Sequence, residues 1–88
     1  MKTNPDYILR TIAGEAILIP TGSAATAFNG MVNLSEVAVF VWQTMDSCAD
    51  MEELVAKVVA EYDVDEATAR ADVQRFVDSL VACGMAQL

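Results

Sequence analysis

The chain has 88 residues, of which 55% are hydrophobic, so it is long enough for one small domain with a single core. Its formal net charge is −8 at pH 7, and its five Lys and Arg residues are scattered along the chain, which argues against a nucleic-acid partner and against a membrane partner. We expect residues 1–88 to form a folded, modestly stable single domain or a dimer.

The first third of the chain predicts a small antiparallel sheet. Two apolar runs, Tyr7–Ile12 and Glu15–Pro20, are rich in β-forming residues, and Gly14 between them supplies the permissive backbone of a hairpin. A third strand is expected from about Ala27 to Val32, where Asn29 and the glycine after it would form a turn or a bulge. Asn4–Asp6 is expected to be a turn or a disordered start.

Three helices should follow, each opened by a capping side chain, Ser35, Asp50 or Asp65. The first should stop around Ser47, and Gly84 should end the third and leave a short tail. The apolar stripes at helical spacing are Val37, Phe40, Val41 and Met45, then Met51, Leu54, Val55, Val58, Val59 and Tyr62, then Ala69, Val73, Phe76, Val77 and Leu80. Three strands followed by three helices make the fold class α+β.

No plausible catalytic or metal-binding equipment is visible in the sequence. The chain has no His to act as a base, and Cys48 and Cys83 do not have metal-ligand spacing. We therefore expect no catalytic residue, no metal and no cofactor. A disulfide between the two thiols stays open, although reduced thiols and a cytosolic location fit better, because the start of the chain lacks a signal peptide. The longest apolar run, Val37–Trp42, is too short to span a bilayer.

A sheet placed before the helices leaves an edge strand whose backbone groups are unpaired, and such an edge can bind an extended peptide. Binding through the Ala27–Val32 edge is therefore the leading functional hypothesis. Phe28 and Met31 lie on this suspected edge, where they would belong either to the core or to the lining of a peptide groove.

The ordered series of these motifs resembles the PqqD-like family, named for coenzyme PQQ synthesis protein D, whose fold is also called the RiPP recognition element. The resemblance covers nearly the whole chain. The matching residues are Leu9–Gly14, Ile17–Gly22, Phe28–Glu36, Phe40–Trp42, Glu61–Asp65, Asp72, Val73, Phe76, Val77 and Leu80.

The resemblance implies a winged-helix-like domain with three antiparallel strands packed on three helices. In the family, the leader of a ribosomally made precursor peptide adds as a strand to the third strand, in a groove bordered by the third helix. It is then presented to a modifying enzyme, which in many systems is a radical SAM protein. By position, the peptide-binding residues would be Phe28, Asn29, Met31 and Val32 on the strand and Arg70, Gln74, Val77 and Val81 on the helix.

The chain departs from the family pattern by its acidity and by Leu34-Ser35-Glu36, where an Asn is typical in place of Ser35. The second change is a conservative exchange of capping residues. The particular pathway, PQQ or another peptide product, therefore stays open.

Two other classes of protein fit a few strands beside three helices. A winged-helix transcriptional regulator is the first, but the third helix mixes Arg70, Gln74 and Arg75 with several acidic residues, which suits a nucleic-acid duplex badly. A structural subunit is the second, in which the edge strand would pair with its own copy, as in a homodimer, or with a partner.

Overall fold

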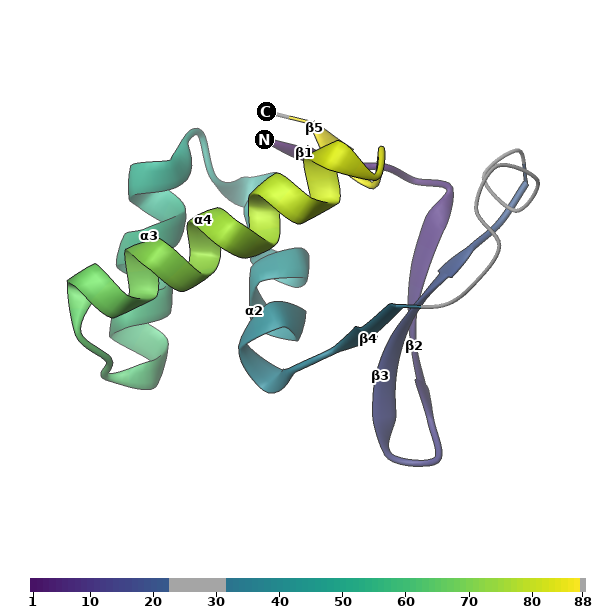
Figure 1. Cartoon of the computed structure of the whole chain (residues 1–88), viewed down its shortest axis with the longest axis horizontal. Helices are drawn as coiled ribbons and strands as arrows, with labels where there is room; N and C mark the ends of the chain where they lie inside the picture. Colours follow the sequence, from purple (N-terminus) through teal and green to yellow (C-terminus); the bar gives the residue numbers. More distant parts are fainter. Residues whose placement is uncertain (23–31, 88) are drawn as a thin grey trace.

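A computed structural model describes residues 1–22 and 32–87 of the chain. The helices lie together on one side of the molecule, and the larger sheet lies on the other (Figure 1). This α+β arrangement, a three-stranded antiparallel sheet followed by helices, confirms the expected fold class. The elements in chain order are β1 (Lys2–Thr3), β2 (Tyr7–Ile12), β3 (Glu15–Pro20), β4 (Val32–Leu34), α2 (Glu36–Thr44), the 3-10 turn η1 (Met45–Ser47), α3 (Met51–Tyr62), α4 (Glu66–Ala82) and β5 (Ala86–Gln87).

The hairpin of β2 and β3 forms where the sequence predicts it. Ile12 pairs with Glu15 at its closed end, and the two residues between them, Ala13 and Gly14, have φ angles of 53° and 81°. Two successive positive φ angles are the pattern of a type I′ turn, whose twist matches the twist of the flanking strands. A glycine at the second position makes this turn inexpensive, so Gly14 fixes the register of the hairpin.

β4 is an edge strand within the described part of the chain, because the sheet order is β2-β3-β4. It pairs antiparallel with β3, from Ala16 opposite Leu34 to Leu18 opposite Val32. The expected third strand, Ala27–Val32, therefore reaches the described residues only at its last position, and residues 27–31 lie outside them. Pairing continues two residues further than expected, up to the residue before the helix cap.

The three helices begin at the predicted caps. The side chains of Ser35, Asp50 and Asp65 each accept a hydrogen bond from the backbone N–H three residues further on, at 3.2, 3.0 and 3.1 Å. Each bond satisfies one of the N–H groups that the first turn of a helix leaves unpaired. The C-terminal expectations are also confirmed, because η1 ends at Ser47 and Gly84 follows α4 with a φ of 74°.

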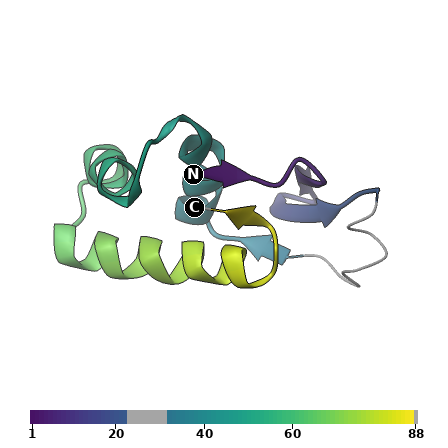
Figure 2. The same cartoon turned by 90° about the horizontal axis from the view of Figure 1, so that it is seen from above.

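The chain ends form a second, two-stranded sheet, whose strand β5 corrects the expectation of a plain C-terminal tail. The expected turn at Asn4–Asp6 is confirmed, because the N–H of Tyr7 donates a hydrogen bond to the carbonyl oxygen of Asn4 at 3.1 Å. β1 and β5 pair antiparallel, with Thr3 opposite Ala86, and the two termini lie side by side in both views (Figure 2). Asp46 in η1 accepts hydrogen bonds from the N–H of Thr3 at 2.6 Å and from its hydroxyl at 2.8 Å. Strands of two residues carry no readable periodicity, so the sequence pattern does not reveal them.

The core lies between the helices and one face of the larger sheet. Leu18, Met45, Leu54 and Val77 are fully buried, and the core stripes predicted for the helices meet there. Phe40 packs against this core and meets Tyr62 edge to face, with ring centroids 5.5 Å apart, which links α2 to α3.

The two faces of the larger sheet differ in what they contact. Side chains alternate across a strand, so the face that carries Leu9, Leu18 and Val32 points to the core. The isoleucines on the opposite face do not belong to the core cluster or to the described residues packed against it, although Ile17 among them is buried, with 7% of its surface exposed. We call this opposite face the outer face; it comprises Ile8, Arg10, Ile12, Glu15, Ile17, Ile19 and Asn33.

Candidate functional site

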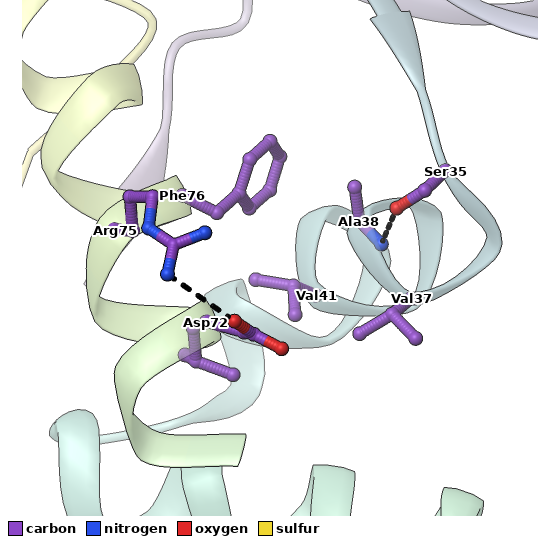
Figure 3. A pocket seen from close by; sticks show the side chains of 8 residues that line it. Ser35, Val37, Ala38, Val41, Asp72, Arg75 and Phe76 are labelled. Atoms are coloured by element: carbon purple, nitrogen blue, oxygen red, sulfur yellow. Dashed lines mark hydrogen bonds and ion pairs between the residues drawn. The ribbon is translucent and has the colours of Figure 1, made fainter. Parts of the chain in front are cut away.

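A pocket of about 450 Å³ opens between α2 and α4, directly beyond the end of β4 (Figure 3). Ser35, the first residue after β4, lines one end of it. Most of its other lining side chains are apolar, and the ring of Phe76 extends from α4 towards α2. The lining residues are Ser35, Val37, Ala38 and Val41 from α2 and its cap, and Asp72, Val73, Arg75 and Phe76 from α4.

The polar groups of the pocket are engaged with one another or with the backbone. The hydroxyl of Ser35 accepts the N–H of Ala38, and the guanidinium of Arg75 lies 3.5 Å from a carboxylate oxygen of Asp72 (Figure 3). A ligand in this pocket would therefore bind through apolar contacts, because the polar side chains already have partners.

The edge of β4 and the pocket together form one continuous candidate site. β4 passes through Ser35 straight into α2, so backbone groups on the open side of the strand and the apolar pocket follow each other along the chain. An added strand would find hydrogen-bonding groups along β4 and apolar contacts beyond its end. Val32, the one predicted strand residue that is described, is half-buried on the core side of β4, whereas Phe28, Asn29 and Met31 lie outside the described residues.

The helix residues predicted from the family pattern lie on a different flank of α4 from the pocket. Arg70, Gln74, Val77 and Val81 recur at spacings of four and three, so they share one side of the helix. Arg70 on that side contacts α3, since its guanidinium donates two hydrogen bonds to Glu52, at 2.6 and 2.8 Å. We call this side the α3 flank of α4, and the side that carries Asp72, Arg75 and Phe76 the α2 flank.

The remaining predicted helix residues also have other surroundings than the pocket. Val77 is fully buried in the core and is not among the residues that line the pocket. Gln74 donates a hydrogen bond to Asp78 at 2.8 Å and is exposed, and Val81 is 38% exposed. Their assignment as peptide contacts stays a prediction, while the pocket points to Phe76, which the sequence pattern placed with the core stripe.

The pKa shifts lie where the helices contact each other. The hydrogen bonds and the positive charge of Arg70 lower the pKa of Glu52, and the same contact raises the pKa of Arg70. Loss of solvent raises the pKa of Tyr62, with a smaller contribution from the carboxylates of Glu36 and Glu61. Because carboxylates engage both arginines of α4, Arg70 and Arg75, this helix suits the phosphates of a duplex badly.

Two other features are absent from residues 1–22 and 32–87. These residues contain no cluster of three or more His, Cys, Asp or Glu side chains arranged to hold a metal ion. No helix in these ranges combines the length and the apolar character that crossing a membrane requires. Cys48, which is buried, and Cys83, which is exposed, are both free thiols.

The fold and the site define a winged-helix-like α+β domain in which β4, the edge strand among the described residues, lies beside an apolar pocket. The family model described as coenzyme PQQ synthesis protein D (PqqD) matches residues 15–86. The match covers most of the 88 residues, so the chain belongs to the PqqD family, as the sequence motifs indicated.

Among solved structures, the chain is similar to one described as TbiB1 in complex with the TbiA(beta) leader peptide. The TM-score is 0.74 at 23% sequence identity, and the match covers 99% of this chain and 95% of that chain. At this identity the similarity establishes a shared fold. A comparison with curated proteins gives no match.

Proposed function

We propose that this chain is a non-catalytic module that binds the leader of a ribosomally synthesised precursor peptide and presents it to a modifying enzyme. The observation that carries this proposal is the open edge of β4, which leads through Ser35 into the apolar pocket between α2 and α4. Membership of the PqqD family supports it, and so does the similar fold of TbiB1, whose structure contains a leader peptide.

The leader binds as a strand added to β4. Main-chain hydrogen bonds along the edge provide affinity with little demand on sequence, and side chains that alternate along the guest provide selectivity. Every second guest side chain points to the core side of the sheet, where the pocket continues beyond β4. The family pattern also assigns Phe28, Asn29 and Met31, which lie outside the described residues, to contacts with the peptide.

The affinity for the leader depends mainly on the large apolar side chains, or anchors, that the leader buries on binding. A dissociation constant of 1 μM corresponds to about 8 kcal/mol, and a flexible peptide must also offset the entropy that it loses on ordering. Each large apolar side chain that the guest buries contributes roughly 1.5–3 kcal/mol. Several anchors are therefore required, and the contacts offered by Val37, Val41 and Phe76 make the pocket the place for at least one of them.

The enzyme that receives the leader is the second partner. In line with the family resemblance, we propose a radical SAM enzyme that modifies the core segment of the precursor while this chain holds the leader. In this role the chain needs neither a metal nor a cofactor of its own.

The test is a titration of the domain with synthetic leaders, taken from candidate precursor peptides sought among the neighbouring open reading frames. We expect micromolar or tighter binding by calorimetry, and slower hydrogen exchange at those backbone amides of β4 that point away from β3, because an added strand pairs with this edge. A scrambled peptide of the same composition is the control. Absence of binding, or binding that leaves exchange in β4 unchanged, would overturn the proposal.

A further inference from the structure

The outer face of the sheet is apolar but does not face the core. Cross-strand pairs place Ile8 beside Ile19 and Arg10 beside Ile17, so that isoleucines dominate the face that points away from the core. Ile12, at the closed end of the hairpin, is 47% exposed and Ile8 is 38% exposed, whereas Ile17 is buried and Ile19 is half-buried. The exposed apolar surface of this face therefore lies along β2. Exposed apolar side chains that gather on one face of a protein commonly mark a surface that binds a partner.

The charge of the outer face differs from that of the chain as a whole. The whole chain has a net charge of −8, whereas the outer face carries one cation, Arg10, and one carboxylate, Glu15. Arg10 is exposed and forms no ion pair with any described residue, while Lys57, Arg70 and Arg75 each have a carboxylate within 4.0 Å. An unpaired cation among isoleucines fits a partner surface that is apolar and offers a carboxylate.

The outer face alone is too small for a permanent homodimer. Strands of six residues are about 20 Å long and neighbouring strands are about 5 Å apart, so three strands cover roughly 200–300 Å². A stable protein interface buries about 800 Å² on each partner. A second copy of this chain would also bring another charge of −8, which opposes self-association.

A guest strand on β4 would enlarge the outer face. Asn33 points to this face from the middle of β4, next to Ile17 of β3. Because side chains alternate, a peptide paired with β4 places every second side chain on the outer face beside Asn33, in the same plane as the isoleucines. The bound peptide therefore adds its own side chains to the surface.

We propose that the outer face is the surface on which the modifying enzyme docks, and that the bound leader completes it. The enzyme contributes an apolar patch over Ile8 and Ile12 and a carboxylate opposite Arg10, and it contacts the outward side chains of the leader as well. The enzyme consequently binds the loaded domain more tightly than the empty one. This inference rests on the proposed leader-binding function, and it adds the partner surface and the order of assembly.

The test measures two affinities for each variant, one for the leader that the titration above identifies and one for the enzyme that modifies its precursor. For the wild type we expect the enzyme to bind the loaded domain at least tenfold more tightly than the empty domain. The double variant Ile8→Glu with Ile12→Glu should keep its leader affinity within twofold, because both side chains lie on the face away from the pocket. Its loaded form should bind the enzyme at least tenfold more weakly.

The matched control is Thr11→Glu, which places the same charged side chain in the same strand on the other face, at an exposed position. It should leave both affinities unchanged. Arg10→Glu should weaken binding of the enzyme without affecting the leader. Circular dichroism spectra that match the wild type establish that each variant is folded.

Each outcome separates this inference from the proposed function. If the wild type does not bind the leader, the proposed function itself fails. If it binds the leader but the Ile8/Ile12 variant still recruits the enzyme as well as Thr11→Glu does, the outer face is not the docking surface. If the enzyme binds the empty and the loaded domain with equal affinity, the bound leader does not form part of the docking surface. If the wild type sediments as a dimer and the Ile8/Ile12 variant as a monomer, the outer face serves self-association and the proposal is overturned.

Discussion

The two flanks of α4 carry similar side chains but meet different surroundings. On the α3 flank, Arg70 closes onto Glu52 through two hydrogen bonds and also lies 3.9 Å from Glu66. On the α2 flank, Arg75 pairs with Asp72 of its own helix and leaves the apolar pocket open beside Phe76. The comparison shows that an ion pair between two helices covers the surface between them, whereas an ion pair within one helix leaves the adjacent surface accessible to a ligand.

The largest effect should come from the core stripe between the two flanks. Val77→Asp puts a carboxylate at a fully buried position without a partner, which should destabilise the fold by about 3–5 kcal/mol. In thermal unfolding, Tm should fall by at least about 12 °C, or the cooperative transition should be lost. Val81→Asp, at a position 38% exposed on the same helix, is the control and should change the stability by less than about 0.5 kcal/mol. A stable Val77→Asp variant would contradict the burial of this stripe.

The second-largest effect should come from substitutions in the pocket, and leader affinity then shows which flank of α4 binds the peptide. Phe76→Ala removes the aromatic side chain of the pocket, and Ala38→Glu places a charged side chain in it from α2. Each should weaken leader binding roughly tenfold, equivalent to ~1.4 kcal/mol, while the fold persists. Gln74→Ala on the α3 flank is the matched control and should leave the affinity within about twofold of the wild type, as expected for a surface substitution. A larger loss for Gln74→Ala than for Phe76→Ala would place the peptide on the α3 flank.

A smaller effect concerns α4 as a whole. Asp65 accepts the N–H of Thr68 at 3.1 Å, and Asp65→Ala should cost about 1 kcal/mol because this N–H loses its partner. The expected fall in Tm is about 4–8 °C for a domain of this size. Asp65→Asn keeps an oxygen acceptor and should restore most of the loss, whereas equal losses for both substitutions would show that the cap is not what Asp65 contributes.

The sequence reveals the core stripe of α4 but not which flank serves the site. Apolar residues at spacings of three and four identify Ala69, Val73 and Val77 as core, and the structure confirms each of them. Either side of such a stripe can border a groove, and the choice depends on where β4 and α2 lie in space. Periodicity contains no such information. The family pattern predicts Arg70 and Gln74 as peptide contacts, which stays a prediction, and the pocket lies on the other flank, beside Phe76.

The strands also divide into those that the local sequence predicts and those that depend on the arrangement of distant elements. The hairpin was predictable because Ala13-Gly14 fixes a two-residue turn between two alternating runs. The terminal pair β1–β5 was not, since its partners are separated by almost the entire chain and each strand has only two residues. Long-range pairing of such short segments depends on the packing of the helices between them.

The smallest effect concerns the ion pair between Glu52 and Arg70 on the α3 flank, whose contribution to stability should depend on pH. The contact with Arg70 lowers the pKa of Glu52 below its usual value of 4.5, so the folded state holds this proton less tightly than the unfolded state. The stabilisation is therefore present above pH 4.5 and is lost as pH falls through the lowered pKa of the folded state. Glu52→Gln should lower Tm slightly at neutral pH, and the difference from the wild type should disappear in acid. Both partners are well exposed, so the difference should also shrink as salt is added. A difference that does not change between neutral and acidic pH would mean that the ion pair does not hold this flank together.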